Sequence, residues 1–121
     1  YSQGIKVGNT VWISGQIPLV AETMEMVKGD ITAEATQVFK NLRAVAEAAG
    51  GELDDAVKIN ISLTDLGDFD AVNAVMAAHL SEPFPARACV QVAALPKGAR
   101  IELEAILVLY SSNDLVSQLS D

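Results

Sequence analysis

The sequence contains few of the side chains from which familiar catalytic and metal-binding motifs are built. Among its 121 residues there is one cysteine and one histidine. A single cysteine cannot close an intrachain disulfide, which favours a reducing, cytoplasmic location. No pair of cysteines or histidines stands at metal-ligand spacing, and no glycine-rich phosphate loop precedes a predicted helix. We therefore expect no metal site.

Basic charge and long apolar runs are also scarce. Eight lysine and arginine residues stand against sixteen acidic ones, a formal net charge of −8. A field of this sign repels nucleic acid and anionic membrane surfaces, so neither is an expected partner. The longest apolar run, Ala105 to Tyr110, is far shorter than the roughly 20 residues of a membrane-spanning helix. The first 30 residues show no basic segment followed by an apolar one, and they predict no secretory signal.

The sequence does contain enough apolar residues to build one core. Half of the 121 residues are hydrophobic, a proportion that suits a single domain of this length. We assign this domain to residues 1–110 and treat the mostly polar residues 111–121 as a C-terminal tail.

Hydrophobic periodicity predicts strands and helices in the order ββαβαββ. Apolar residues at helical spacing predict helices over residues 30–49 and 68–80, with Asp30 or Thr32 as the N-cap of the first and Asp68 as the N-cap of the second. Strand-helix-strand units favour parallel neighbours and terminal hairpins favour antiparallel ones. We therefore expect an α+β fold with one mixed sheet and both helices on one face. Alternating or extended patterns predict the strands over residues 2–7, 10–14, 56–63, 86–92 and 100–110.

The alternating patterns also assign faces to the strands. In the strand over residues 56–63, Val57 shares an apolar face with Ile59, Ile61 and Leu63. The last strand has one apolar face, and its other face begins with acidic residues and ends with apolar ones. This second apolar stretch needs a cover, for which another copy of the chain is the expected partner. The acidic residues are Glu102 and Glu104, and the apolar ones are Ile106, Val108 and Tyr110.

A few side chains could carry chemistry, and each also has a structural interpretation. Arg87 opens a strand and shares its face with Cys89, so it either pins a carboxylate of the protein or receives a substrate carboxylate through two parallel hydrogen bonds. Glu102 and Glu104 fit either a solvated, salt-bridged edge or a catalytic site. Spacing alone leaves these alternatives open. His79 and Cys89 fit packing roles better than catalytic ones, although Cys89 could also be the wall of a pocket.

Five segments of the sequence fall in an order that is typical of one known family. They are residues 1–4 (YSQG), 14–18 (SGQIP), 72–73 (VN), 85–96 (PARACVQVAALP) and 101–105 (IELEA). Together they resemble the Rid family, the reactive intermediate deaminases also called the YjgF group, and the likeness covers roughly residues 1–109. The last two segments are the most specific. Arg87 places the chain near the enamine/imine deaminase branch.

The resemblance implies a chorismate-mutase-like α+β fold, assembled as a homotrimer with pockets between its subunits. It also implies hydrolysis of 2-imino or enamine acids, such as 2-iminopropanoate and 2-iminobutanoate, to 2-keto acids and ammonia without a cofactor. Carried over by position, Arg87 would bind the substrate carboxylate and Glu102 would hold or activate water. The other pocket residues would be Tyr1, Ser14, Gly15, Asn73 and Cys89.

Two other functions compete with this interpretation. A non-catalytic trimeric module that binds small carboxylates, with a regulatory or chaperone-like role, would need Arg87 alone, whereas catalysis would also depend on Glu102. Ribonuclease action is attributed to some relatives, but the net charge of −8 and the lack of a basic stripe disfavour it.

Overall fold

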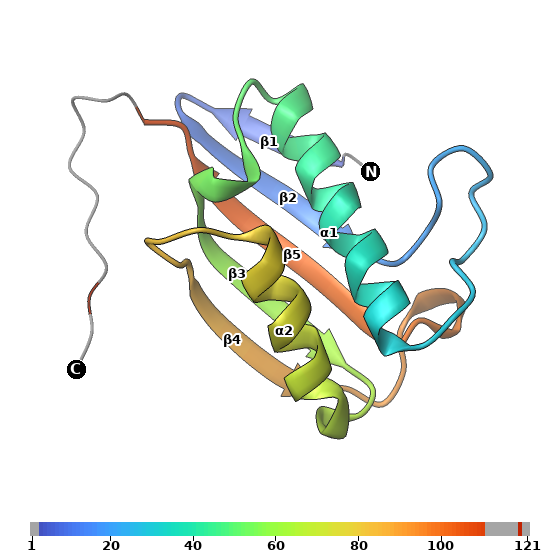
Figure 1. Cartoon of the computed structure of the whole chain (residues 1–121). Helices are drawn as coiled ribbons and strands as arrows, with labels where there is room; N and C mark the ends of the chain where they lie inside the picture. Colours follow the sequence, from blue (N-terminus) through green and yellow to red (C-terminus); the bar gives the residue numbers. More distant parts are fainter. Residues whose placement is uncertain (1–2, 111–118, 120–121) are drawn as a thin grey trace.

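Figure 1 shows the computed structural model, in which two helices lie across one face of a mixed sheet. The structure describes residues 3–110 and residue 119. Tyr1 and most of the predicted tail therefore lie outside the described residues. Within the described part of the chain, no helix has the length and apolar character needed to cross a membrane.

The observed elements follow the predicted order ββαβαββ. Three short 3₁₀ turns, Leu53–Asp55, Leu66–Asp68 and Pro96–Gly98, join some of them. The α+β fold class is thereby confirmed. The strands and helices are β1 (Gly4–Val7), β2 (Thr10–Gln16), α1 (Ile31–Ala48), β3 (Ala56–Leu63), α2 (Phe69–His79), β4 (Ala86–Gln91) and β5 (Ile101–Val108).

The two helices begin in different ways. Of the two predicted caps, Asp30 is the one that caps α1, because its carboxylate accepts a hydrogen bond from the backbone N–H of Ala33 at 2.9 Å. Asp68 stands at the N-cap of α2 but makes no capping hydrogen bond, so that prediction was wrong. Its backbone is already helical, with φ −83° and ψ −3°, whereas a capping side chain needs an extended backbone. The carboxylate of Asp65 instead accepts from Gly67 in the preceding turn.

The sheet has the strand order β1-β2-β5-β3-β4. β3 and β4 are parallel as predicted, but β5 lies between β2 and β3 and is antiparallel to both. The expected hairpin between β4 and β5 was therefore wrong, and β2 and β3 are not neighbours. The physical reason is burial: the side chains of Ile101, Leu103 and Leu107 are 0% exposed, and so apolar a strand is most stable with a strand on each side.

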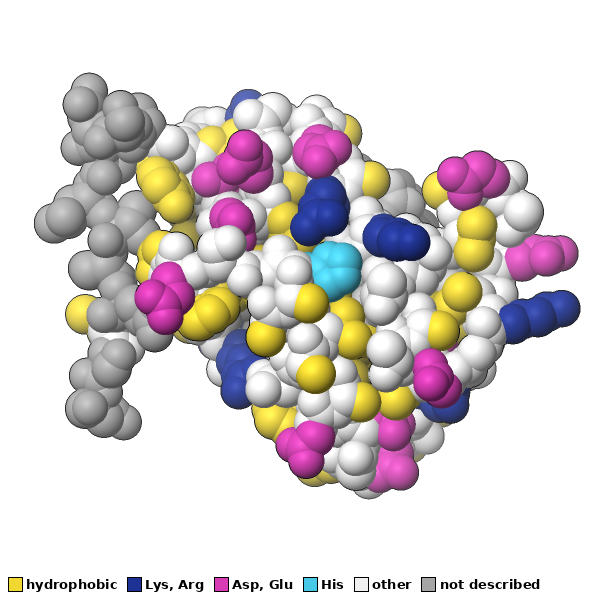
Figure 2. All heavy atoms as spheres, in the orientation of Figure 1, with side chains coloured by type: hydrophobic (Ala, Val, Ile, Leu, Met, Phe, Trp, Pro, Cys, Tyr) yellow, Lys and Arg dark blue, Asp and Glu magenta, His cyan; other side chains and the backbone are white. Residues whose placement is uncertain are grey.

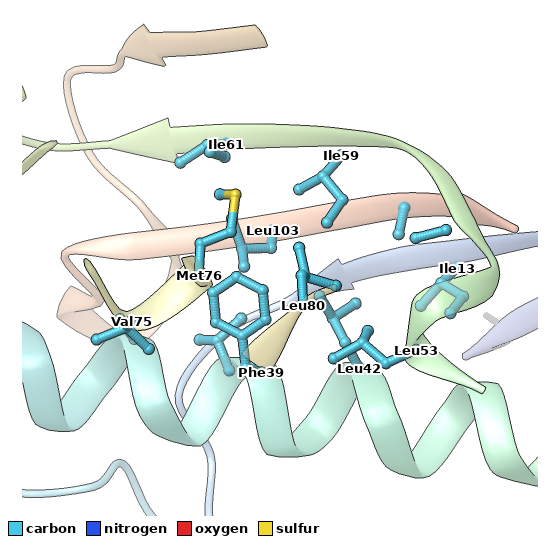
Figure 3. Close-up of a cluster of buried hydrophobic side chains, with 14 of the residues drawn as sticks. Ile13, Phe39, Leu42, Leu53, Ile59, Ile61, Val75, Met76, Leu80 and Leu103 are labelled. Carbon is cyan, nitrogen blue, oxygen red and sulfur yellow. The ribbon is translucent and has the colours of Figure 1, made fainter. Parts of the chain in front are cut away.

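The core lies between the sheet and the helices (Figure 3). Phe39 and Leu42 of α1 meet Ile59 and Ile61 of β3, and all four side chains are at most 1% exposed. The prediction for Val57 was wrong, because the register of β3 against β5 shifts between Ala56 and Lys58 and Val57 is 40% exposed. A bulge of this kind sends one side chain away from the face that alternation assigns to it.

The other face of the sheet has no helix over it in the described part of the chain (Figure 1). Its β1-β2-β5 side is apolar: Ile5 pairs with Trp12, and Trp12 pairs with Ile106. Trp12 is 46% exposed and Ile5 is 52% exposed, which is unusual for such large apolar side chains. We call Ile5, Val7, Trp12, Ile106 and Val108 the apolar patch.

Candidate functional site

Arg87 is the second residue of β4 and points to the helix-covered side of the sheet. Its register partner on β3, Ile59, is buried under the helices, and side chains paired in this way share a face. The Arg87 Nη1 donates a hydrogen bond to Oδ1 of Asn73 on α2, and its guanidinium carbon lies 5.0 Å from the centre of the Phe69 ring. Phe69 and Asn73 stand four residues apart on one side of α2. We call Phe69, Asn73 and Arg87 the arginine cluster.

A cavity of about 260 Å³ opens beside the arginine cluster. One wall comes from α2, the other from the loop that enters β4 and from Arg87 itself. The cavity is therefore apolar over most of its lining and polar where the guanidinium and the Asn73 amide meet. Its lining residues are Asn73, Met76, Ala77, Phe84, Pro85 and Arg87.

The Arg87 guanidinium has no acidic partner in the described part of the chain, where the one ion pair joins Arg100 to Glu34. The alternative in which Arg87 pins a carboxylate of its own protein is therefore wrong for these residues. Asn73 accepts from Nη1, and among the described residues no oxygen accepts from Nε or Nη2. Those two groups form the edge of a guanidinium that matches both oxygens of a carboxylate.

Cys89 follows Arg87 on the same face of β4, as the alternating pattern predicts. It is half-buried and packs against the core. Burial raises the pKa of the Cys89 thiol, and the positive charge of Arg87 offsets part of this rise. A thiol with a raised pKa is a weak nucleophile near neutral pH, which disfavours covalent catalysis by Cys89. Cys89 is not among the residues that line the cavity beside Arg87.

Ser14 and Gly15 lie in an irregular stretch of β2, where its register against β5 shifts between Ile13 and Gln16. Bulges of this kind re-aim side chains next to functional sites. A Cβ atom added to Gly15 would lie 2.7 Å from the carboxyl carbon of Glu102, so the Glu102 side chain packs directly on the bare Cα of this glycine. We call Gly15 and Glu102 the glutamate cluster, whereas Ser14 lines a cavity together with Asn60 and Glu104.

The two neighbouring glutamates of β5 have different surroundings. Asn60 of β3 donates a hydrogen bond to Oε1 of Glu104 at 2.9 Å, whereas no described residue donates to the carboxylate of Glu102. Neither glutamate forms an ion pair within residues 3–110, so the interpretation as a salt-bridged edge was wrong there. Glu102 is thus the carboxylate whose oxygens remain available to a water molecule or a substrate.

The arginine cluster and the glutamate cluster lie on opposite faces of the sheet. Arg87 pairs with Ile59 and Glu102 pairs with Ser62 on the same strand, β3. Ile59 and Ser62 are three positions apart on one strand, so their side chains point to opposite faces. One chain therefore does not bring Arg87 and Glu102 together.

His79 has the packing role that its helix position predicts. Its ring stacks on Phe39 of the core, with the ring centres 5.4 Å apart and an interplanar angle of 16°. Figure 2 shows the histidine beside two basic side chains on the helix-covered side. Burial lowers the pKa of His79, and the charges of Arg43 and Lys40 lower it further. Among the described residues, no three His, Cys, Asp or Glu side chains are grouped as a metal site.

A family model described as Endoribonuclease L-PSP matches residues 1–109. The chain belongs to the Rid (YjgF) family. A protein of Dermatophagoides farinae named 2-iminobutanoate/2-iminopropanoate deaminase is 51% identical to it, over 90% of this chain and 85% of that protein. The human protein of the same name is 43% identical, over 89% of this chain and 79% of its own length.

A solved Rid-family structure has the same fold. RidA from the Antarctic bacterium Psychrobacter is 61% identical and superposes with a TM-score of 0.87, over 89% of this chain and 87% of that one. The resemblance drawn from the sequence motifs is therefore confirmed. The individual site residues stay predictions, and Tyr1 lies outside the described residues.

Several neighbours of the Rid-family motif residues were not predicted as part of the site. Phe69 and Met76 contact the Arg87 guanidinium, and Phe84 lines the cavity next to it. Phe69 and Met76 follow the apolar stripe of a helix, which assigns them to the core. The sequence signal for Phe84 was its place directly before Pro85 and the strand that Arg87 opens, but this position alone does not indicate a cavity.

Proposed function

We propose that this protein is a 2-iminobutanoate/2-iminopropanoate deaminase, which hydrolyses small 2-imino acids to 2-keto acids and ammonia. The observation that carries the proposal is the Arg87 guanidinium, which borders a cavity and lacks an acidic partner among the described residues. Relatives with the name of this activity match most of the chain at 43% to 51% identity.

Arg87 binds the substrate carboxylate. Two parallel hydrogen bonds from a planar guanidinium hold a carboxylate and fix its orientation, which a single point charge does not do. Asn73 and Phe69 hold the guanidinium in place from α2, so little side-chain freedom is lost when the substrate binds. Orientation of the neighbouring imine carbon follows from the fixed carboxylate.

Glu102 activates the attacking water. The imine carbon is already electrophilic, so water forms the new C–O bond there while its proton passes to the carboxylate. The nitrogen is protonated, the new hydroxyl group loses its proton as the C=O bond forms, and the C–N bond breaks to release ammonia and a 2-keto acid. The net reaction consumes one water and needs neither an oxidant nor a cofactor. The partner of this protein is thus a small imino or keto acid.

The complete site forms between subunits of a homotrimer. Arg87 and Glu102 lie on opposite faces of one sheet, so the glutamate cluster of one subunit must meet the arginine cluster of another. The apolar patch beside the glutamate cluster supplies a surface for this contact. We place the protein in the cytoplasm, which suits its single cysteine.

The test is a coupled assay in which a serine or threonine dehydratase releases the imine. The protein should accelerate the loss of the imine beyond its spontaneous hydrolysis in water. Glu102→Gln should lower this acceleration about a hundredfold, the size of a lost general base, whereas Glu104→Gln should retain it within about twofold. The two variants make the same chemical change on one face of β5, so Glu104→Gln is the matched control.

Three other results would contradict the proposed function or the role of Glu102. If imine hydrolysis is not accelerated but keto acids bind in an Arg87-dependent way, the protein is a binding module and not a deaminase. Equal losses in Glu102→Gln and Glu104→Gln would contradict the role of Glu102. Cleavage of RNA by the parent protein, abolished in Arg87→Ala, would instead support the activity named in the description of the family model.

A further inference from the structure

Two glutamines beside the bulge of β2 have no part in the proposed reaction. Gln3 precedes β1 in the segment YSQG, and Gln16 ends β2 in the segment SGQIP. Their side chains meet, because Nε2 of Gln16 donates a hydrogen bond to Oε1 of Gln3 at 2.9 Å. Gln16 is 8% exposed, and a buried amide lowers stability unless its hydrogen bonds are made. We call this contact between Gln3 and Gln16 the glutamine bridge.

The glutamine bridge lies against the backbone of Ser14, where β2 leaves the regular ladder. The register of β2 on β5 shifts between Ile13 and Gln16. A bulge removes ladder partners from backbone groups, which then need other partners. The Ser14 N–H donates to the backbone carbonyl of Gln3 at 2.9 Å, and the Ser14 carbonyl accepts from Nε2 of Gln16 at 3.0 Å. The two glutamines thus hold both backbone groups of Ser14 in place.

The backbone that the glutamine bridge holds is the one against which Glu102 packs. Gly15 follows Ser14, and a Cβ atom added to Gly15 would lie 2.7 Å from the carboxyl carbon of Glu102. Gln16 pairs with the buried Leu103 and shares its face, whereas Glu102 points to the other face of the sheet. Gln16 therefore reaches the glutamate through the backbone of the bulge and not by side-chain contact.

We infer that Gln16 is a positioning residue: through the glutamine bridge it fixes the bulge of β2 in the conformation that orients Glu102 for the attack of water. This inference rests on the proposed function. Gln16 does not line the cavity beside Arg87, so binding of the substrate carboxylate does not depend on it. Loss of the bridge should therefore lower kcat and leave KM nearly unchanged, because it weakens an interaction made only in the transition state.

Gln16→Met tests this role, because methionine has nearly the length of glutamine but no amide to donate. In the dehydratase-coupled assay, kcat should fall at least about tenfold while KM stays within about twofold of the parent value. In the Glu102→Gln background, the same substitution should lower kcat by less than about twofold, because no catalytic carboxylate is left to position.

Gln37→Met is the matched control. Gln37 is a half-buried glutamine of α1, and its Nε2 donates a hydrogen bond to Oδ1 of Asn41 at 3.0 Å. The same chemical change there removes a hydrogen bond that does not involve Ser14. The Gln37→Met protein should keep kcat within about twofold of the parent value, because no catalytic group is displaced.

Hydrogen exchange examines the bulge without any substrate. The Ser14 N–H is hydrogen-bonded, and opening of the bulge exposes it to water. Exchange measured by mass spectrometry on a peptide of residues 11–17 should be at least about tenfold faster in Gln16→Met than in the parent protein, and unchanged in Gln37→Met. Gln3→Met changes an exposed side chain and removes only the acceptor of the bridge, so it should show the same two effects to a smaller extent.

The outcomes separate this inference from the proposed function. No acceleration of imine hydrolysis by the parent protein would overturn the deaminase assignment itself. Unchanged exchange in folded Gln16→Met, faster exchange with parental kcat, or a tenfold loss of kcat that persists in the Glu102→Gln background would overturn the positioning role and leave the deaminase assignment in place. If Gln16→Met does not fold, Gln3→Met decides by the same two measurements.

Discussion

Arg87 shows how one side chain is prepared for a ligand by its neighbours. An exposed arginine ordinarily samples many rotamers, but this one donates to Asn73 and stacks over Phe69. Both contacts come from α2, so the helix fixes the guanidinium while it leaves the Nε and Nη2 edge without an acceptor among the described residues. The Arg87 side chain therefore loses its conformational entropy when the protein folds and not when the ligand binds. This increases the affinity for a very small ligand.

Substitution of Arg87 should therefore affect both binding and rate. Arg87→Ala removes both hydrogen bonds to the substrate carboxylate, each worth about 1.5–3 kcal/mol, so kcat/KM for imine hydrolysis should fall at least a hundredfold, a rough value. Arg87→Lys keeps the charge but not the planar pair and should lose at least about tenfold. Circular dichroism should show both variants folded. A folded Arg87→Ala protein as active as its parent would contradict carboxylate binding by Arg87.

His79 makes stability depend on pH. Burial and the charges of Arg43 and Lys40 lower its pKa in the folded state, whereas the unfolded chain keeps the ordinary value of about 6.5. The unfolded state thus binds more protons as the pH falls through this region, and the free energy of unfolding decreases by at most about 1.4 kcal/mol per pH unit from this group. Urea unfolding at pH 7.5 and 5.5 measures the decrease.

His79→Gln is the control for this pH effect, because glutamine does not titrate. The loss of unfolding free energy between pH 7.5 and 5.5 should be smaller in His79→Gln than in the parent protein. An identical loss in the two proteins would assign the pH dependence to other groups.

At the level of elements, the irregular stretch of β2 connects the fold to the site. Gly15→Ala would place a Cβ 2.7 Å from the Glu102 carboxyl carbon and displace a flexible side chain rather than backbone. We expect kcat to fall at least about tenfold, because a shift of 1 Å in a catalytic group costs roughly a hundredfold. The free energy of unfolding should change by less than about 1 kcal/mol.

A double-mutant cycle checks the cause of that loss. If Gly15→Ala acts by displacing Glu102, its effect on kcat should nearly disappear in the Glu102→Gln background. Full additivity of the two losses would show that Gly15 acts independently of Glu102.

The elements themselves could be predicted because their patterns are local. Alternation along residues 101–108 identified the buried face of β5, and the apolar stripe of α1 with Asp30 before it identified the helix and its cap. The position of β5 could not be predicted in this way, since its pairing with β2 joins residues far apart in the sequence. The outward turn of Val57 was missed because a bulge breaks the alternation without changing the residue types.

The site was predictable only in part for a related reason. Arg87 stood out as a cation in an apolar strand, but its spacing did not distinguish a structural from a binding role. Motif resemblance supplied Asn73, Gly15 and Glu102. The contact of Glu102 with Gly15 depends on the register shift of β2, and the stacking of Phe69 on Arg87 depends on how α2 crosses β4. Neither contact can be predicted from the hydrophobic periodicity of a single segment.

For the whole molecule, the proposed assembly and the proposed site both depend on the uncovered face of the sheet. That face combines the apolar patch with the glutamate cluster, while the arginine cluster lies on the opposite face. Burial of Ile5, Trp12 and Ile106 against another subunit would gain about 25 cal/mol for each Å² of apolar surface removed from water. The same contact would supply the residues that one chain lacks at each half of the site.

A charge within the apolar patch should therefore abolish both assembly and catalysis. The parent protein should elute with a mass three times the 12.8 kDa of the chain when size exclusion is combined with light scattering. Trp12→Glu should give the mass of one chain and no imine hydrolysis, because a buried unpaired carboxylate opposes association.

Leu66→Glu is the control, because it introduces the same charge outside the apolar patch. Leu66 is 47% exposed and Trp12 is 46% exposed. The Leu66→Glu protein should remain trimeric and active. A monomeric parent protein, or a Trp12→Glu monomer with parental activity, would show that one chain holds a complete site and that the trimer is not required.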